Sequence, residues 1–201
     1  MARPQLKKKS VFIDMTAMSD VTVLLLTFFM LTSTFVKKEP VKVNVPSSVS
    51  EIKIPDQNIL TILVDKKGEV FMSLDQKDMV DVLTEVGDKY NMTFTPAQEA
   101  NFAKLATFGV PMAAMGQFLS LKADQQDAAM KEAGGIPCDS TDNQFKDWVK
   151  AARTVNPEIR IAIKSDQDTP YSTVKKVMNS LQDLDENRYN LITNLKVESA
   201  E

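Results

Sequence analysis

Residues 15–36 read MTAMSDVTVLLLTFFMLTSTFV, and Asp20 is the single charged residue in this stretch. At about 1.5 Å per residue, a helix of this length reaches roughly 33 Å, which is enough to cross a hydrocarbon layer of about 30 Å. Mean hydropathy over the whole chain is only −0.19, so the stretch is one apolar segment on a mainly polar protein. The sequence therefore predicts a single N-terminal transmembrane helix over residues 15–36.

The flanks of this helix predict its orientation. Residues 1–14 form a short tail with one arginine and three lysines, whereas most of the chain follows the helix. Short basic tails stay in the cytoplasm, so we expect residues 1–14 to be cytoplasmic and the remainder to be exported. A cleaved signal peptide is the alternative, but no pattern of small residues follows the apolar run at Thr34 to Lys38.

Asp20 is the most informative residue of the helix. An ionised carboxylate in hydrocarbon costs about 2.5–3.5 kcal/mol even on lenient scales, and burial favours the protonated form. At about 100° per residue, three hydroxyls lie within about 40° of Asp20 around the helix, those of Thr16, Thr27 and Thr34. We expect Asp20 to translocate protons beside this polar stripe. The alternative is that Asp20 lies at the membrane interface or caps the helix.

Composition excludes most kinds of enzyme. The chain has no histidine and one cysteine, Cys138, which removes histidine-dependent nucleophiles, common zinc motifs and an internal disulfide. Its six glycines are not spaced as a phosphate-binding loop. Basic charge gathers at the N-terminus, which is not the pattern of a nucleic-acid-binding surface. We therefore expect no enzyme activity, no cofactor, no metal site and no nucleic-acid partner.

Residues 37–57 predict an extended linker outside the cytoplasm. They contain three prolines and a short VKVNV alternation at 41–45, with no helical period. The simplest role of this segment is that of a spacer. A second interpretation is that Val41, Val43 and Val45 add as an edge strand to a partner or to a second copy.

The next part of the chain predicts a β-hairpin followed by a helix. Residues 58–64 and 69–72 are β-rich runs separated by a turn. A helix is expected over residues 76–89, with Asp75 or Ser73 as its cap. The buried face of this helix should hold four apolar residues, Met79, Val80, Leu83 and Val86.

The C-terminal part repeats the arrangement. We expect a strand over residues 159–163, then a turn, then a helix with Thr169 as cap and Pro170 at its first position. The helix should bury a stripe made of Val174, Val177, Met178, Leu181 and Leu184, and a last strand should span residues 189–195. Four strands and two helices of this kind predict an α+β two-layer domain over residues 58–201.

Residues 91–153 separate these two parts and predict a helical insertion. Thr95 and Pro96 start a helical stretch, and Pro111 and Gly116 are expected to interrupt it. After a break at residues 134–137, a cap within residues 139–141 should start a helix that carries Phe145, Trp148 and Val149. The methionines and aromatic residues of the insertion are expected to fill a core. Its surface is a hypothetical site for a partner or for the cell wall.

Two stretches of the sequence resemble the ExbD/TolR family. IDMTAMSDVTVLLLTFFML, residues 13–31, is similar to the N-terminal signature of the family, although Ala17 and Ser19 replace the usual proline and aliphatic residue. IRIAIKSDQDTPYSTVKKVMNSLQDLDENRYNLIT, residues 159–193, is similar to the strand, acidic turn, amphipathic helix and closing strand of the family. Two separate matches in the right order are more specific than either alone.

The resemblance implies a single-pass subunit of the bacterial inner membrane with a periplasmic domain. It implies that the chain works with a second copy inside a ring of ExbB-like subunits, and that Asp20 carries protons to energise TonB-dependent transport. A TolR-like subunit of the Tol-Pal envelope system, which binds peptidoglycan, is the first alternative. A non-catalytic membrane-tethered adaptor or sensor, in which Asp20 only fixes helix pairing, is the alternative from another class.

Overall fold

The computed structural model describes residues 15–32, 41, 43–48, 58–139, 142–192 and 194–195. The chain divides into two compact units, Met1–Val36 and Lys37–Glu201, and each is described by itself. The predicted basic tail, Thr34 and most of the predicted linker lie outside the described residues.

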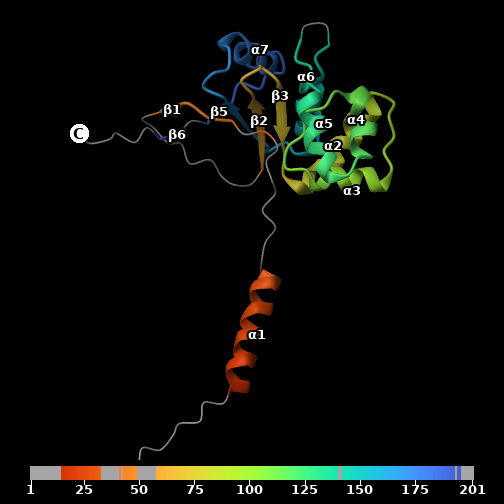
Figure 1. Cartoon of the computed structure of the whole chain (residues 1–201). Helices are drawn as coiled ribbons and strands as arrows, with labels where there is room; N and C mark the ends of the chain where they lie inside the picture. Colours follow the sequence, from red (N-terminus) through yellow and green to blue (C-terminus); the bar gives the residue numbers. More distant parts are fainter. Residues whose placement is uncertain are drawn as a thin grey trace, which may run out of the picture. The chain divides into compact units, whose positions relative to one another are not determined.

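The first unit contains helix α1, Met15–Thr32 (Figure 1). Within the described residues it is the one helix whose length and composition suit a membrane span, with 18 residues and a mean hydropathy of 1.6. None of its residues is buried within the chain. The predicted apolar helix is therefore present, and its predicted last turn at residues 33–36 lies outside the described part.

The second unit contains a four-stranded sheet in the order β3-β2-β4-β5. Strand β2 (Ile59–Val64) pairs antiparallel with β3 (Val70–Ser73), which is the predicted hairpin. Strand β2 also pairs in parallel with β4 (Arg160–Ser165), and β4 pairs in parallel with β5 (Tyr189–Leu191). Together with its helices, this sheet confirms the predicted α+β fold after one N-terminal apolar helix.

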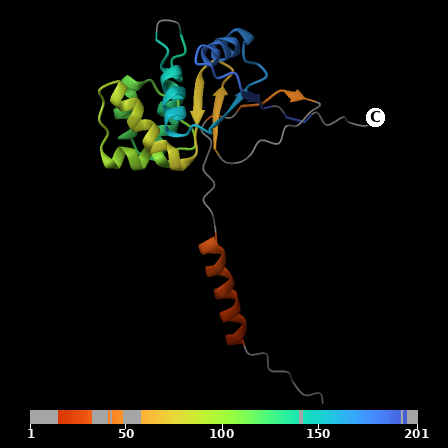
Figure 2. The ribbon, with the colours of Figure 1, turned by 180° about the vertical axis from the view of Figure 1, so that it is seen from behind.

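Helices of the second unit extend from the sheet in a chain of pairwise contacts. Their bounds are Gln76–Lys89 (α2), Pro96–Lys104 (α3), Met112–Leu119 (α4), Ala123–Glu132 (α5), Gln144–Val155 (α6) and Tyr171–Gln182 (α7). Helix α2 contacts α3 and α6, α3 contacts α4, α4 contacts α5, and α6 contacts α7. Figures 1 and 2 show α3, α4 and α5 on one side of strands β2 and β3, and α7 on the other side.

The insertion shares one hydrophobic core with the sheet. Trp148 of α6 is fully buried, and its ring lies 6.0 Å from the ring of Phe102 and 4.7 Å from that of Phe108, measured between centroids. The same core includes Ile62 of β2 and Met79 of α2. The prediction that the methionines and aromatic residues of the insertion fill a core is confirmed.

The insertion also covers one edge of the sheet. Backbone groups of Met72 in β3 and Phe108 exchange two hydrogen bonds of 2.8 Å, and the N–H of Ile136 donates to the carbonyl oxygen of Val70 at 2.8 Å. A Cβ atom on Gly135 would lie 2.7 Å from the nitrogen of Val70, so this close approach needs glycine. Strand β5 forms the opposite edge, and no described strand pairs with its outer side.

The C-terminal strands differ from the sequence prediction. Strand β4 continues to Ser165 because its parallel register with β2 extends to Val64. The single strand predicted at residues 189–195 is two strands, β5 and β6 (Asn194–Leu195). Strand β6 pairs in parallel with β1 (Ser47–Ser48), so one β-rich run serves two separate sheets.

Two predicted helix caps are wrong because another residue holds the N-cap position. Pro170 is the N-cap residue of α7, and the hydroxyl of Thr169 donates to the carbonyl oxygen of Asp65 at 3.1 Å. Asn143 caps α6 by accepting a hydrogen bond from the N–H of Lys146 at 3.1 Å, in place of a residue within 139–141. Thr95, in contrast, starts α3 as predicted, and the structure shows that it forms a capping box with Gln98.

Helices α2 and α4 depart from the prediction in smaller ways. Asp75 is the N-cap residue of α2 but makes no cap bond, because its carboxylate accepts from the N–H of Asn58 at 2.7 Å. Val82 is buried in place of the predicted Val80, which is only half-buried. Gly116 lies inside α4 rather than interrupting it, since one glycine costs a helix only about 1 kcal/mol.

Candidate functional site: Asp20 in α1 and the polar junction at Asp166

Helix α1 carries Asp20 in its second turn, with an otherwise uncharged sequence on both sides. The residue is exposed, and no described residue forms a hydrogen bond or an ion pair with its carboxylate. All of the large apolar residues of α1 are exposed as well. The helix therefore presents one acidic group on a surface that suits lipid or apolar protein partners.

The threonines of α1 bond to their own helix. Thr22 donates to the carbonyl oxygen of Met18 at 2.8 Å, and Thr27 donates to that of Leu24 at 2.9 Å. Helical geometry places Thr16 and Thr27 on the face of Asp20, but Thr27 lies seven residues away, or about 10 Å along the axis. With its donor used, the Thr27 oxygen is left as an acceptor on that face. The role of Thr16, Thr27 and Thr34 stays a prediction, and Thr34 lies outside the described residues.

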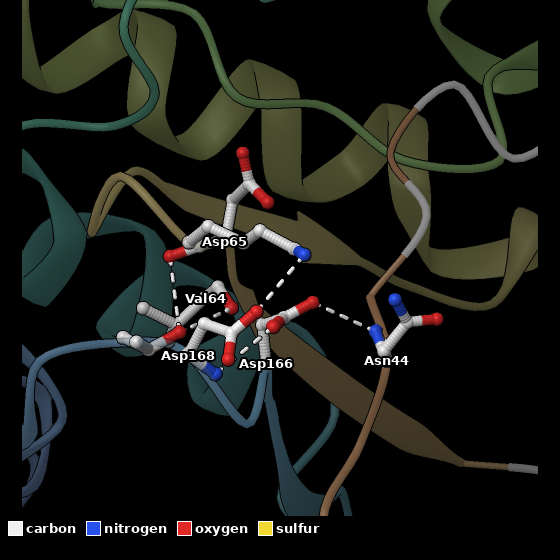
Figure 3. A network of polar contacts seen from close by, with 7 residues as sticks. Asn44, Val64, Asp65, Asp166 and Asp168 are labelled. Atoms are coloured by element: carbon white, nitrogen blue, oxygen red, sulfur yellow. Dashed lines mark hydrogen bonds and ion pairs between the residues drawn. The ribbon is translucent and has the colours of Figure 1, made fainter.

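A second cluster of polar groups lies where β2 and β4 end. These strands run in parallel with Val64 opposite Ser165, so the residues that follow them, Asp65 and Asp166, reach the same end of the sheet. The N–H of Asp166 donates to the carbonyl oxygen of Val64 at 3.0 Å. Figure 3 shows the resulting junction, with Asn44 entering from a distant part of the sequence.

The Asp166 carboxylate ties the linker to this end of the sheet. Its Oδ2 accepts from the N–H of Asn44 at 2.8 Å, and its Oδ1 accepts from the N–H of Asp168 at 3.1 Å (Figure 3). The N–H of Gln167 donates back to the carbonyl oxygen of Asn44 at 2.9 Å. Asp166 is only 3% exposed, so these bonds are shielded from water. We name the described residues 41 and 43–48 the strap.

Apolar contacts hold the strap as well. Val41 and Val45 are buried, and Val43 is partly buried and packs against the hydrophobic core. The interpretation that these valines add to a partner or to a second copy differs from this arrangement, in which they pack within their own chain. Backbone pairing of β1 with β6 follows directly after them.

The electrostatics of Asp166 favour its charged form. Burial alone would raise the pKa of this carboxyl, but hydrogen bonds from the N–H groups of Asp168 and Asn44, and the charge of Lys66, hold its pKa below the ordinary value of 3.8. The ion pair between Lys66 and Asp168, with 3.0 Å between Nζ and Oδ2, is exposed and contributes little to the stability of the fold. Asp166 is therefore a permanently ionised structural group at neutral pH.

The described residues contain no group of three or more acidic or cysteine side chains that could hold a metal ion. Sequence reasoning identified Asp166 only through the family resemblance and missed its link to Asn44. The two residues are 122 positions apart, and no local pattern connects them. The adjacent prolines and valines of the linker predicted an extended segment, which is the conformation that the strap requires.

The fold and the apolar helix together define a class, namely a small α/β domain that follows a single apolar helix suited to a membrane. Residues 7–196 match the family model described as Biopolymer transport protein ExbD/TolR, and the chain belongs to the ExbD/TolR family. No curated protein and no solved structure matches the chain.

Members of the ExbD/TolR family share several general properties. Members are membrane-anchored subunits that energise biopolymer transport, and they are not enzymes. They work in complexes with ExbB/TolQ-type partners. The apolar helix α1 fits a single membrane anchor in such a protein.

Proposed function

We propose that this chain is the proton-motive-force-transducing subunit of an ExbB-ExbD type inner-membrane motor that energises TonB-dependent outer-membrane transport. Asp20 is its proton-carrying carboxylate. The observation that carries the proposal is the single carboxylate, in the second turn of an otherwise uncharged, apolar and exposed helix. A charged residue in a membrane span is by default a functional one.

The energetics of one proton transfer suit this role. Exposing an ionised carboxylate to hydrocarbon costs about 2.5–3.5 kcal/mol or more, and protonation removes most of that cost. A membrane potential supplies about 2.3 kcal/mol per charge per 100 mV. Protonation from one side of the membrane lets Asp20 move past the apolar surface of a surrounding ring. Release of the proton on the other side restores the charge of Asp20 and stops its movement. Each transit then drives one step of motion.

The parts of the chain have matching roles in this proposal. Residues 1–14 are a cytoplasmic basic tail, residues 15–36 span the membrane, and residues 37–57 link the helix to a periplasmic domain over residues 58–201. A ring of ExbB-like subunits surrounds α1 together with the same helix from a second copy of this chain. The periplasmic domain passes the motion to TonB. Thr16, Thr27 and Thr34 supply hydroxyl acceptors along the path of Asp20.

Replacement of Asp20 by asparagine tests the proposal. The Asp20→Asn variant keeps the size and the hydrogen-bonding capacity of the side chain but cannot ionise, so we expect loss of proton-driven uptake with normal membrane insertion. Thr22→Val is the matched control, because Thr22 bonds only to the backbone of α1 and faces away from Asp20. Full uptake by Asp20→Asn would establish the adaptor alternative, in which the side chain only pairs helices.

Purification of the complex from native membranes separates TonB from Tol function. Proteins that co-purify with the tagged chain are identified by mass spectrometry, and we expect an ExbB-like subunit and TonB. Recovery of TolA in place of TonB, together with binding to purified peptidoglycan, would assign the chain to the Tol-Pal system. In that case the proton step is tested by comparing the cell-envelope integrity of Asp20→Asn and parent cells, because TonB-dependent uptake reports on the TonB system alone.

A further inference from the structure

The arginines of the second unit gather at one groove. Residues 58–195 contain twelve lysines but only three arginines, Arg153, Arg160 and Arg188. All three line a groove of about 640 Å³, together with Ile159, Asp185, Glu186, Asn187, Tyr189 and Asn190. We name this the arginine groove. Its volume is within the range of ligand-binding sites, about 300–1,000 Å³.

Arg153 forms a fixed wall of the arginine groove. Its guanidinium makes a bidentate ion pair with Glu186, with two N–H···O distances of 2.6 Å. It also donates to the carbonyl oxygens of Pro157 at 2.6 Å and Ile159 at 2.9 Å. Asp185 has a φ of 60°, and this left-handed turn after α7 precedes Glu186 directly. The side chains of Arg153 and Glu186 are therefore held in place.

Arg160 and Arg188 remain available for a ligand. Both side chains are exposed, and neither forms a hydrogen bond or an ion pair with any described residue. A guanidinium presents a planar fork of donors that matches a carboxylate or a phosphate, whereas a lysine ammonium does not. The use of arginine only at this groove, in a domain that otherwise uses lysine, indicates recognition of such an anionic group.

A second hollow extends the arginine groove beyond the Arg153–Glu186 pair. It measures about 420 Å³ and shares Arg153, Asp185 and Glu186 with the first hollow. Lys150 adds a cation to its lining, and Asp183 adds a carboxylate that is paired with Lys146 at 2.7 Å. The combined surface suits an elongated ligand of several residues better than a single small ion.

The charges and amides of the lining suit an acidic peptide. Asp185 and Glu186 stand beside the arginines, and Glu186 is already neutralised by Arg153. Arg160 and Arg188 then outnumber the remaining acid, Asp185, so the lining keeps a net positive charge that attracts an anionic ligand. The side-chain amides of Asn187 and Asn190 can bond to the amides of a peptide backbone.

We propose that the arginine groove binds an acidic peptide segment of a partner protein, with Arg160 and Arg188 as the carboxylate-binding residues. This binding does not rest on proton transfer by Asp20. It gives the domain a charge-based contact that weakens with rising salt concentration.

A peptide-binding measurement on the full chain in nanodiscs of zwitterionic lipid tests this proposal. The probe is a fluorescein-labelled peptide of alternating glutamate and glycine, and its glutamine counterpart is the uncharged control. We expect the glutamate peptide alone to raise the fluorescence anisotropy. The Arg160→Gln, Arg188→Gln double variant should weaken its Kd at least about tenfold, as loss of charged hydrogen bonds does.

The matched control is the Lys104→Gln, Lys175→Gln double variant. It removes the same charge from two exposed lysines outside the arginine groove, and we expect its Kd to stay within about twofold of the parent value. Equal weakening by both double variants, or none by the arginine variant, would overturn the proposal. Displacement of the labelled peptide by inorganic pyrophosphate at lower concentrations than by unlabelled glutamate peptide would overturn it in favour of a phosphate ligand.

Discussion

Asp20 in α1 and Asp166 after β4 carry the same side chain in opposite surroundings. Asp166 accepts hydrogen bonds from two backbone N–H groups and is only 3% exposed. Asp20 has no bonded partner among the described residues and lies on an apolar helix. A buried carboxylate that accepts two backbone hydrogen bonds is held in its ionised form. The comparison assigns a structural role to Asp166 and supports the proposal that Asp20 carries the proton.

Asp20→Asn gives the largest expected effect and tests one half of this comparison. We expect energised uptake to fall to the background of a strain that lacks the chain, while the thermal midpoint of the second unit is unchanged. Asp20 contributes no contact to the described fold, so there is no reason for a stability change. Calorimetry on the purified full chain measures the midpoint. A lowered midpoint would show that Asp20 also has a structural role.

Trp148→Ala should destabilise the second unit without changing Asp20 or Asp166. Removal of this fully buried ring from its contacts with Phe102 and Phe108 is expected to cost about 3–5 kcal/mol of unfolding free energy. Urea denaturation monitored by circular dichroism measures the change. Trp148→Phe is the milder control, because it keeps an aromatic ring and removes an indole N–H that has no acceptor among the described residues. A loss of unfolding free energy below about 1 kcal/mol is typical of a surface substitution. It would mean that the insertion does not share one hydrophobic core with the sheet.

Asp166→Ala tests the other half of the comparison. It leaves the N–H groups of Asn44 and Asp168 without their acceptor, which costs about 1–3 kcal/mol for a buried group. We expect faster hydrogen exchange and proteolysis at residues 43–48, with the sheet unaffected. Asp168→Ala is the matched control, since it removes an exposed carboxylate and keeps the backbone N–H that bonds to Asp166. Unchanged exchange in Asp166→Ala would mean that the valines alone hold the strap.

The pH dependence of the strap follows from the lowered pKa of Asp166. A carboxyl whose pKa is lower in the folded than in the unfolded chain stabilises the fold above its ordinary value of 3.8, and this contribution is lost as the pH falls below 3.8 through the folded value. The difference in thermal midpoint between the parent and Asp166→Asn should be constant near neutral pH and should shrink in acid. A difference that grew in acid would contradict the assigned charge state.

Lys66→Gln gives the smallest expected effect. Lys66 is half exposed and its ion pair with Asp168 is open to water, so the free energy of unfolding should not change measurably. Thermal unfolding at low and at high salt checks this. A clear loss that disappears at high salt would show that Lys66 adds to the backbone hydrogen bonds in holding Asp166 ionised.

Local sequence signals predicted the elements that depend on local physics. The predicted bounds of α2 match the structure, and α3 starts at Thr95 and Pro96 as expected. The hairpin of β2 and β3 also follows from alternation and a turn. In each case the residues that determine the element are within a few positions of one another.

Errors occurred where a distant partner decides the outcome. Thr169 has the chemistry of a helix cap but bonds to the end of β2, more than a hundred positions away. The run at residues 189–195 divides because its second part meets β1 of the linker. The arginine groove was not predicted for the same reason, since Arg153, Arg160 and Arg188 converge only in the folded chain.

The covered β3 edge limits how this sheet can take part in an assembly. Phe108 and Ile136 already use backbone groups of β3, so another chain can extend the described sheet only alongside β5. Two copies that met at β5 about a two-fold axis would leave no open edge for a third copy. Growth of this sheet therefore ends with a closed pair, and the insertion protects the protein from forming filaments through it.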